Sequence, residues 1–563
     1  MIGLISATAA GAAARDRLAA AWPDRTRVYD GPVGDAVRRA FAECEQLVCF
    51  LATGAVVRLV APLLGDKASD PGVVCVDEGG RFAVSLVGGH GGGANELAHE
   101  VGELLGAQPV VTTATDAVGV PGLDTLGLPV EGAVAAVSRA LLDGEPVTLH
   151  NESGWPLPAL PVASEGAYGV RVTDRLVELS GQEVVLRPPT LVVGVGASKG
   201  APAEEVLELI EGSLREAGLS PRSVAALATV DAKAGEPGIV AAAERLGVPL
   251  VTHPAEELAA VEVPNPSDAP LTAVGTPSVA EAAALLGGGE LLVPKRKSAA
   301  SPAMATCAVV RRPVRGRLAV VGLGPGARDL LTPRAKAELQ RASVLVGLDQ
   351  YVDQIRDLLR PGTRVLESGL GAEEERARTA VEEARKGQAV ALIGSGDAGV
   401  YAMASPALAE ASDDIDVIGV PGVTAALAAA AILGAPLGHD HVSISLSDLH
   451  TPWEVIERRV RAAAEADIVV TFYNPRSRGR DWQLPKALAI LTEHREPATP
   501  VGVVRNASRP DESVRLTTLE ALDPATVDMM TVVTVGNTAT RDIAGRMVTP
   551  RGYRWQTSEE GSK

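Results

Sequence analysis

The chain has 563 residues, which is more than one hydrophobic core spans. Of these residues 46% are hydrophobic and 22% charged, a balance that is ordinary for globular proteins and disfavours a disordered chain. Its 52 basic and 70 acidic residues leave a net charge of −18, and only 3% of the residues are aromatic. Polyanion binding and base stacking are therefore disfavoured as the main function, and no nucleic-acid partner is expected.

We expect no secretory or membrane-spanning segment in this chain. The most apolar run, residues 423–437, is too short to cross a bilayer and is broken by Gly434 and Pro436. Residues 1–6 lack the basic region of a signal peptide and predict a first strand. The four cysteines are scattered without a C-x-x-C pair, which favours reduced thiols over a metal site. We expect a cytoplasmic protein without a bound metal or a membrane partner.

Short apolar runs alternate along the whole chain with patterns of helical period. This alternation predicts an α/β fold with several sheets of largely parallel strands. Breaks rich in proline or arginine predict boundaries near residues 154–161, 187–190 and 311–316. The predicted domains are an N-terminal α/β domain at 1–129, a small middle module at 130–188, a further α/β domain at 189–312, and two lobes at 316–436 and 437–556.

His90 lies in a glycine-rich run, residues 88–93, between a predicted strand at 83–87 and a predicted helix at 95–105 capped by Asn95. A single histidine is more often structural. Glycines on both sides, however, let backbone approach a ligand closely and fix the imidazole, which favours a functional role. The charged residues that follow share one helical face, which we interpret as solvated rather than metal-binding. They are Glu96, His99, Glu100 and Glu103.

Polar or glycine-rich turns also follow predicted strands at 111–116, 194–200, 228–233 and 274–281. Lys199 and Lys233 lie in two of these turns and would suit an anionic ligand. Together and in this order, the motifs of residues 1–312 resemble the cobalamin-biosynthesis hydrolases that act on cobalt-precorrin-5A. Residues 190–312 also resemble a small stand-alone protein of that pathway.

The hydrolase resemblance implies that the first half opens a lactone and releases acetaldehyde. By similarity, His90 is the leading catalytic candidate and Glu96 the second. A histidine acting as general base on water suits lactone opening, although no Ser-His-Asp arrangement can be read from the sequence. The alternative is that this half binds unstable corrinoid intermediates without chemistry.

The glycine run 322–326 follows a predicted strand at 318–321 and matches the G-x-G-x-x-[G/A] dinucleotide fingerprint, with Asp349 at about the expected distance. The helix start signal, Thr332-Pro333, comes too late for the helix N-terminus to face a pyrophosphate. Pro325 also removes an N–H from the loop. A dinucleotide site is therefore disfavoured, and an NAD-dependent oxidoreductase remains an alternative.

The run Gly394–Tyr401 directly follows a predicted buried strand at 389–393, so it belongs at the edge where open α/β sheets bind their ligands. Its three glycines within six residues allow close approach of a ligand to the backbone. Comparable signals at further strand ends point to one shared cleft. They lie at 419–425, 445–448, 469–475 and 532–538.

These motifs, from about residue 317 to 554, resemble the tetrapyrrole (corrin/porphyrin) methylases that use S-adenosylmethionine. The resemblance is carried by residues 322–326, 394–403, 421–425 and 473–475. Within that family, residues 346–351, 445–449 and 535–538 look most like the precorrin-3B C-17-methyltransferases. The resemblance implies a two-lobed fold with the cofactor between the lobes, methylation at C-17 with ring contraction, and a homodimer. It leaves open whether the substrate carries cobalt.

The resemblance also assigns site residues. The cofactor-binding residues would be Gly394, Ser395, Gly396, Asp397, Ala398, Gly399, Val400, Tyr401, Thr424, Ala425, Tyr473 and Asn474. Asp397 would pair with the cofactor's ammonium or ribose, or act as a base. The substrate-binding residues would be Gly322, Gly324, Pro325 and Gly326. Arg476, with Arg478 and Arg480, would hold substrate carboxylates, and Lys199 and Lys233 would do so in the first half. The chain is thus interpreted as a bifunctional corrin-ring enzyme.

Overall fold

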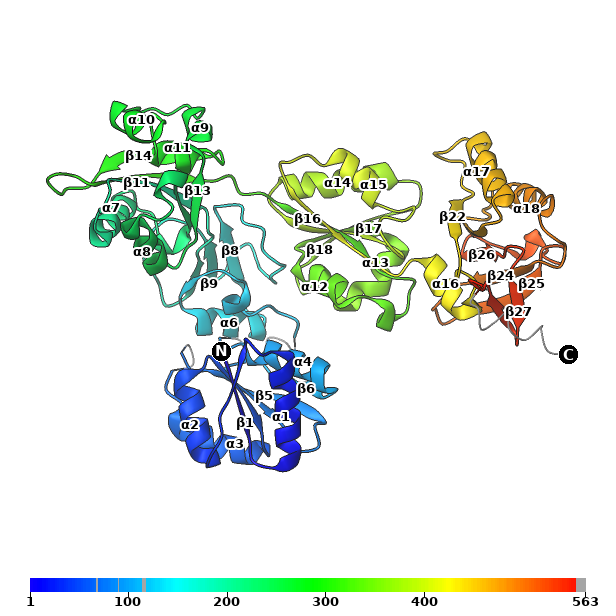
Figure 1. Ribbon diagram of the computed structural model, residues 1–563, viewed down its shortest axis with the longest axis horizontal. Helices are drawn as coiled ribbons and strands as arrows, with labels where there is room; N and C mark the ends of the chain where they lie inside the picture. Colours follow the sequence, from blue (N-terminus) through cyan, green and yellow to red (C-terminus); the bar gives the residue numbers. More distant parts are fainter. Residues whose placement is uncertain (67–68, 90, 114–117, 553–563) are drawn as a thin grey trace. The chain divides into compact units, whose positions relative to one another are not determined.

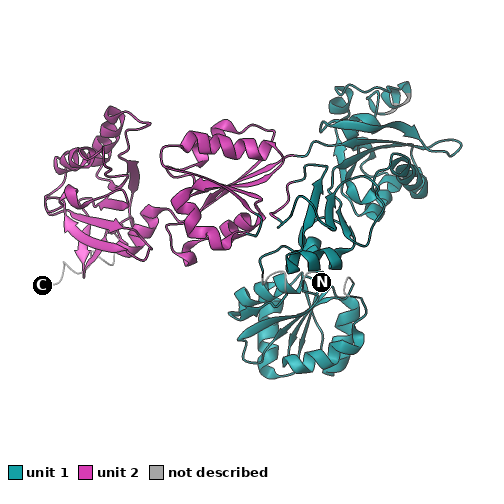
Figure 2. Cartoon of the chain, turned by 180° about the vertical axis from the view of Figure 1, so that it is seen from behind, with its two compact units in different colours: residues 1–155, 160–314, 360–362 teal, residues 156–159, 315–359, 363–563 magenta. Residues whose placement is uncertain are grey.

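The computed structural model describes residues 1–66, 69–89, 91–113 and 118–552 (Figure 1). These residues form two compact units (Figure 2). One unit holds residues 1–155, 160–314 and 360–362, and the other holds residues 156–159, 315–359 and 363 onward. Each unit contains sheets covered by helices, which confirms the predicted multidomain α/β class. The division into five domains stays a prediction.

The first sheet of unit 1 has the strand order β2-β1-β3-β4-β5-β6 and is parallel except for the β4–β5 pair. Leu18 and Leu97 pack on one face of this sheet, and Val37 and Val56 pack on the other. Both faces of the sheet are therefore buried, which explains why β4 is a continuous run of apolar residues. The elements are β1 (Ile2–Ser6), α1 (Ala9–Ala21), β2 (Thr26–Val28), α2 (Val33–Glu43), β3 (Gln46–Phe50), α3 (Thr53–Val60), β4 (Gly72–Val76), β5 (Phe82–Val87), α4 (Ala94–Leu105) and β6 (Gln108–Val110).

Two further sheets complete unit 1, with orders β7-β10-β9-β8 and β13-β12-β11-β15-β14. The smaller one comprises β7 (Val130–Gly132), α6 (Val134–Asp143), β8 (Val147–Asn151), β9 (Tyr168–Val172) and β10 (Glu183–Leu186). The larger comprises β11 (Leu191–Ala197), α7 (Ala203–Glu216), β12 (Val224–Val230), α8 (Pro237–Leu246), β13 (Leu250–His253), α9 (Ala255–Ala259), α10 (Asp268–Val274), α11 (Ala280–Leu285), β14 (Glu290–Lys297) and β15 (Ala305–Arg311). An ion pair joins them, because buried Asp174, next to β9, accepts from Arg311 of β15 at 2.6 Å.

Unit 2 begins with a five-stranded parallel sheet of order β18-β17-β19-β16-β20. Its elements are β16 (Arg317–Gly322), α12 (Pro333–Arg341), β17 (Val344–Leu348), α13 (Asp349–Ile355), β18 (Arg364–Ser368), α14 (Glu373–Arg385), β19 (Ala389–Gly394), α15 (Ala404–Glu410) and β20 (Asp416–Val420). Helices cover both faces of the sheet (Figure 1). The predicted late helix start is confirmed: α12 begins at Pro333, and the Thr332 hydroxyl accepts from the Ala335 N–H at 3.1 Å.

The neighbouring strands β16 and β19 lead to opposite faces of this sheet. After β16 the chain enters α12, whose Ala335 and Leu339 pack on one face. After β19 it enters α15, whose Ala407 packs on the other face with α14. This divergence is a topological switch point, where open α/β sheets form their ligand crevices. The fold thus places the loops after β16 and β19 at the expected binding edge.

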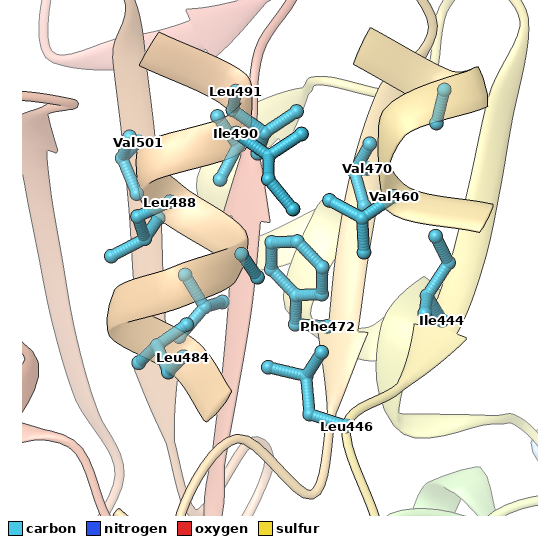
Figure 3. Packing of buried hydrophobic residues seen from close by; sticks show 14 of the residues in the cluster. Ile444, Leu446, Val460, Val470, Phe472, Leu484, Leu488, Ile490, Leu491 and Val501 are labelled. Atoms are coloured by element: carbon cyan, nitrogen blue, oxygen red, sulfur yellow. The ribbon is translucent and has the colours of Figure 1, made fainter. Parts of the chain in front are cut away.

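The rest of unit 2 is built on a mixed sheet of order β22-β23-β26-β24-β25, with a small sheet β21-β28-β27 beside it. Its elements are α16 (Ala425–Leu433), β21 (Gly434–Ala435), β22 (His441–Ser445), α17 (Trp453–Glu465), β23 (Val469–Tyr473), α18 (Gln483–Thr492), β24 (Pro500–Arg505), β25 (Ser513–Thr518), β26 (Thr531–Val535), β27 (Arg541–Ile543) and β28 (Arg546–Val548). The fully buried Phe472 ring lies among side chains of α17 and α18 at the centre of its core (Figure 3). Over the described residues, no helix combines the length and apolarity needed to cross a membrane.

Truncating Phe472 should loosen this core selectively. Phe472→Ala removes a ring with no exposed surface, and such truncations destabilise by about 3–5 kcal/mol. We expect faster amide hydrogen exchange in peptides from β24 and β26, measured by mass spectrometry. Val514→Ala, on the exposed part of β25, is the control and should change exchange little. Equal protection in both variants would contradict this assignment of the core.

Candidate functional site

Three glycine-containing loops meet at the carboxyl edge of the parallel sheet in unit 2. Gly324 and Gly396 exchange two backbone hydrogen bonds of 2.9 and 2.8 Å, so the loops after β16 and β19 are joined directly. A Cβ atom at Gly422, in the loop after β20, would lie 2.1 Å from the Gly396 carbonyl oxygen. Part of the glycine requirement predicted for ligand approach is therefore explained by the packing of loops against each other.

Asp397 fastens two of these loops. One carboxylate oxygen accepts from the Gly399 N–H at 2.8 Å, and the other accepts from the Gly422 N–H at 3.0 Å. The side chain is half-buried. Both oxygens thus already receive backbone hydrogen bonds, which gives Asp397 a positioning role within the site. Its role toward the cofactor, or as a base, stays a prediction.

Two tyrosines of unit 2 face each other, one in the loop after β19 and the other at the end of β23. The ring centroids of Tyr401 and Tyr473 are 5.2 Å apart at an interplanar angle of 55°. Tyr401 has a φ of 53°, a left-handed conformation that is unusual for a bulky residue, and its hydroxyl donates to the Ser443 carbonyl at 2.7 Å. The Tyr401 backbone is therefore strained at a sequence-predicted site position.

Tyr473 joins the end of β23 to the start of α16. Its hydroxyl accepts from the Ala426 N–H at 2.8 Å and is hydrogen-bonded to the Thr424 hydroxyl. Burial raises the pKa of Tyr473, while the hydrogen bond with Thr424 opposes the shift. The phenol is consequently neutral at physiological pH. The predicted residues Thr424 and Tyr473, together with the Ala426 N–H, thus form one hydrogen-bonded corner of the site, and cofactor binding by Ala425 stays a prediction.

A cavity of about 400 Å³ lies beside the tyrosine pair, lined by Gly399, Val400, Tyr401, Ala402, Ser405 and Ser443. Its volume falls in the range of small-ligand pockets, about 300–1,000 Å³. Backbone groups, two hydroxyls and an aromatic ring line it, which suits a ligand with an adenine ring and polar ends. The residues present therefore fit S-adenosylmethionine. Ser443 and Ser405 carried no signal in the sequence, because a serine inside a strand or a helix is not distinctive by itself.

Two arginines of the predicted cluster after β23 donate hydrogen bonds to backbone carbonyls. Arg476 donates to the Ala525 carbonyl at 2.6 Å. Arg480 is 7% exposed and donates to the carbonyls of Leu446 and Asn474. Burial lowers the pKa of Arg480. Substrate binding by Arg476 stays a prediction, whereas Arg480 fastens the ends of β22 and β23.

Asn474 has a φ of 50° and donates to the Ser445 hydroxyl at 3.1 Å, so the polar strand ends predicted to meet do meet here. A further contact involves a tyrosine that ends one of the family motifs. Burial raises the pKa of the Tyr351 phenol, and an interaction with the Ser395 side chain opposes this shift. Tyr351, near the start of α13, therefore lies close to the loop after β19.

In unit 1, His90 lies outside the described residues, as do residues 114–117. The predicted capping role of Asn95 is wrong. The cap of α4 is Gly93 with a φ of 69°, because glycine alone adopts this conformation without strain. Asn95 is instead 5% exposed, accepts from the Ser85 hydroxyl at 2.7 Å and donates to Thr113 at 3.0 Å.

This polar trio of Ser85, Asn95 and Thr113 packs directly beneath the glycine run. A Cβ at Gly89 would lie 2.9 Å from Thr113 and 3.0 Å from the Asn95 oxygen. Glu96 is exposed on the first turn of α4, and its catalytic role stays a prediction. In the larger sheet of unit 1, Lys233 is paired with Glu236 at 3.1 Å, and Lys199 is exposed. Substrate binding by these two lysines likewise stays a prediction.

Comparison with known proteins gives three family matches. Residues 317–523 match the profile of the Tetrapyrrole (Corrin/Porphyrin) Methylases. Residues 35–116 match Cobalamin synthesis G N-terminal, and residues 191–310 match Cobalamin synthesis G C-terminus. The matches therefore fall in both units.

Curated relatives align with the methylase segment. The "Probable cobalt-factor III C(17)-methyltransferase" of Salmonella typhimurium is 47% identical over 239 residues, covering 42% of this chain and 99% of the relative. The "Precorrin-3B C(17)-methyltransferase" of Sinorhizobium sp is 40% identical over 250 residues, covering 42% and 97%. Longer relatives are covered over about half of their length, at 46% and 48%.

A solved structure titled "Crystal structure of the methyltransferase CobJ" is 40% identical, with coverage of 42% of this chain and 100% of that chain and a TM-score of 0.41. The near-complete coverage of relatives well above 30% identity decides the family. The chain belongs to the tetrapyrrole (corrin/porphyrin) methylases, which use S-adenosylmethionine, and it carries cobalamin synthesis G segments ahead of the methylase segment.

Proposed function

We propose that unit 2 transfers a methyl group from S-adenosylmethionine to C-17 of precorrin-3B or cobalt-factor III, with contraction of the ring, in cobalamin biosynthesis. The observation that carries the proposal is the set of joined glycine loops beside a cavity of about 400 Å³, in a segment 47% identical to a relative named for this reaction. A dinucleotide oxidoreductase loses its support, because α12 begins only at Pro333 and the family is a methylase family.

The residues of this chain would bind and align the cofactor and the substrate rather than activate the methyl group. S-adenosylmethionine supplies a sulfonium methyl group that is already activated for transfer. Backbone groups of Gly399–Ala402 would hold the cofactor, and the neutral Tyr473 with Thr424 would fix the start of α16 against it. Correct alignment of two reactants can lower a barrier by about 7–11 kcal/mol. The rigid hydrogen-bonding of these loops supports such a role.

We further propose that unit 1 opens the lactone of cobalt-precorrin-5A and releases acetaldehyde. The supporting observations are the two cobalamin synthesis G matches and the polar trio beneath the glycine run 88–93. His90 would act as general base on the water that breaks the ester bond. The hydroxyl so freed would then lose its proton and form the carbonyl of acetaldehyde, while the carbon–carbon bond to the macrocycle breaks and leaves its electron pair on the ring, which is protonated. A cytoplasmic location and a homodimer formed through the methylase segment complete the proposal. The location rests on the N-terminal sequence and the scattered cysteines, and the homodimer rests on the family resemblance.

Product analysis tests the methyl transfer directly. The chain is incubated with S-adenosylmethionine and either precorrin-3B or cobalt-factor III, and the tetrapyrrole is analysed by mass spectrometry. We expect the mass of one added methyl group on one of the two substrates, which would also decide whether the substrate carries cobalt. No methylation of either substrate, together with tight binding of NADH, would contradict the proposal.

Gly422→Ala should weaken cofactor binding, because its methyl group would lie 2.1 Å from the Gly396 oxygen and force the loops apart. We expect at least a roughly tenfold rise in the dissociation constant of S-adenosylhomocysteine by calorimetry, which corresponds to about 1.4 kcal/mol. Gly419→Ala, in the preceding strand β20, is the matched control because nothing lies within 4 Å of its added Cβ. Equal dissociation constants of S-adenosylhomocysteine for the two variants would show that the loop junction does not support cofactor binding.

His90→Ala should lower acetaldehyde release from cobalt-precorrin-5A by about 10²–10⁴-fold, the usual contribution of a general base. Acetaldehyde is measured by coupled reduction with alcohol dehydrogenase. Methyl transfer by the same variant is the internal control and should be unchanged. No release from the unsubstituted chain would favour the alternative, in which unit 1 only binds corrinoid intermediates. Unchanged release from His90→Ala would remove His90 from the reaction.

A further inference from the structure

Arg509, in the turn between β24 and β25, reaches the glycine loop after β16. Its Nε donates to the Pro325 carbonyl at 2.9 Å. Its side chain lies flat against Gly326, where a Cβ would be 2.7 Å from the Arg509 Cγ. Gly326 has no Cβ, and this absence leaves space for the Arg509 side chain; its φ of 144° is also a conformation that residues with a side chain rarely adopt. Arg509 is thereby held at the switch-point edge described above.

The turn that carries Arg509 is strained. Asn506 and Ser508 have φ values of 51° and 64°, left-handed conformations that cost free energy in residues other than glycine. The buried Asn506 Oδ1 also has no hydrogen-bond partner in the described part of the chain. Strain of this kind persists only where surrounding contacts enforce it, and it concentrates at functional sites.

Neighbouring acidic groups hold the strained turn rather than neutralise Arg509. Asp511 accepts from Asn506 at 2.5 Å and from Arg505 at 3.3 Å. Glu512 accepts from the Ser508 N–H at 2.6 Å. Within the described ranges, no carboxylate forms an ion pair with Arg509, and only its Nε has a hydrogen-bond acceptor. The Nη1 and Nη2 end of the guanidinium therefore keeps its charge and its donors.

The surroundings of Arg509 place this charge inside the site. Burial raises the pKa of Tyr351, and the positive charge of Arg509 opposes that shift, so the guanidinium lies near this phenol. By contrast, Arg476 and Arg480 donate to backbone carbonyls. Arg509 is half-buried, so an anion bound to it would be only partly screened by water.

We propose that Arg509 binds a carboxylate side chain of the macrocyclic substrate through Nη1 and Nη2 at the rim of the Gly322–Gly326 loop. This contact would fix the position and orientation of the bound macrocycle. The inference rests on the proposed function, because the acetate and propionate side chains of a tetrapyrrole supply the carboxylate. A planar guanidinium binds a carboxylate with two parallel hydrogen bonds, which fixes orientation as well as position.

The test compares three substitutions in the full chain. Arg509→Ala removes the charge and the bond to Pro325, Arg509→Gln can keep a donor to Pro325 without charge, and Arg509→Lys keeps the charge. We expect the KM for the tetrapyrrole to rise about 10- to 100-fold in the Ala and Gln variants and to recover in part with Lys, because a charge-assisted hydrogen bond is lost. The dissociation constant of S-adenosylhomocysteine should stay within about twofold in all three.

Arg458→Ala, an exposed arginine on α17, changes the net charge equally and should leave KM unchanged. Normal KM in Arg509→Gln would overturn the proposal and assign Arg509 to holding the Pro325 loop. Normal KM in Arg509→Ala would overturn it as well. Absence of methyl transfer by the unsubstituted chain would instead count against the proposed function. In that case, titration of uroporphyrin III by absorbance still tests whether Arg509 binds a tetrapyrrole carboxylate.

Discussion

The site in unit 2 depends on the paired backbone hydrogen bonds between Gly324 and Gly396. Two parallel strands, β16 and β19, end side by side, and this bond pair joins their loops before the chain leaves toward opposite faces of the sheet. Gly422 then packs on the junction with no space for a side chain, and Asp397 fastens it through the Gly422 N–H. Asp397 also accepts from the Gly399 N–H, which links this junction to the backbone that lines the cavity beside Tyr401. Such preorganisation is what an alignment-driven methyl transfer requires.

Local signals in the sequence predicted this part of the fold well. Thr332-Pro333 gave the start of α12, because capping and proline preference act within one turn. Most of the glycine runs and polar strand ends meet as expected, since parallel strands present their carboxyl ends at one edge of the sheet. The end of β26 does not: β26 is antiparallel to β23, so Asn537 and Thr538 lie beside Asp467, at the opposite end of β23 from Asn474. The α/β class and the methylase family followed from the same elements.

What could not be predicted depends on tertiary contacts. Asn95 has the preferred chemistry of a helix cap, yet it is buried against Ser85 and Thr113, and Gly93 takes the cap position. Ser443 is one serine in a strand, and only the position of Tyr401 makes it part of the cavity. Arg509 is separated from Pro325 by 184 residues, so no local pattern connects the two. The arginines after Asn474 looked free for substrate, and two of them donate to carbonyls instead.

Because main-chain carbonyls accept these hydrogen bonds, the site tolerates substitutions unevenly along the sequence. Arg509 donates to the main chain of Pro325, Tyr401 to that of Ser443, and Arg480 to that of Leu446. A main-chain acceptor survives replacement of the side chain that belongs to it. Mutations on the accepting side therefore leave these fastenings in place, and mutations of the donors remove them. Selection for the geometry of the site should fall unevenly, on a few donor side chains, while the segments they hold remain free to change.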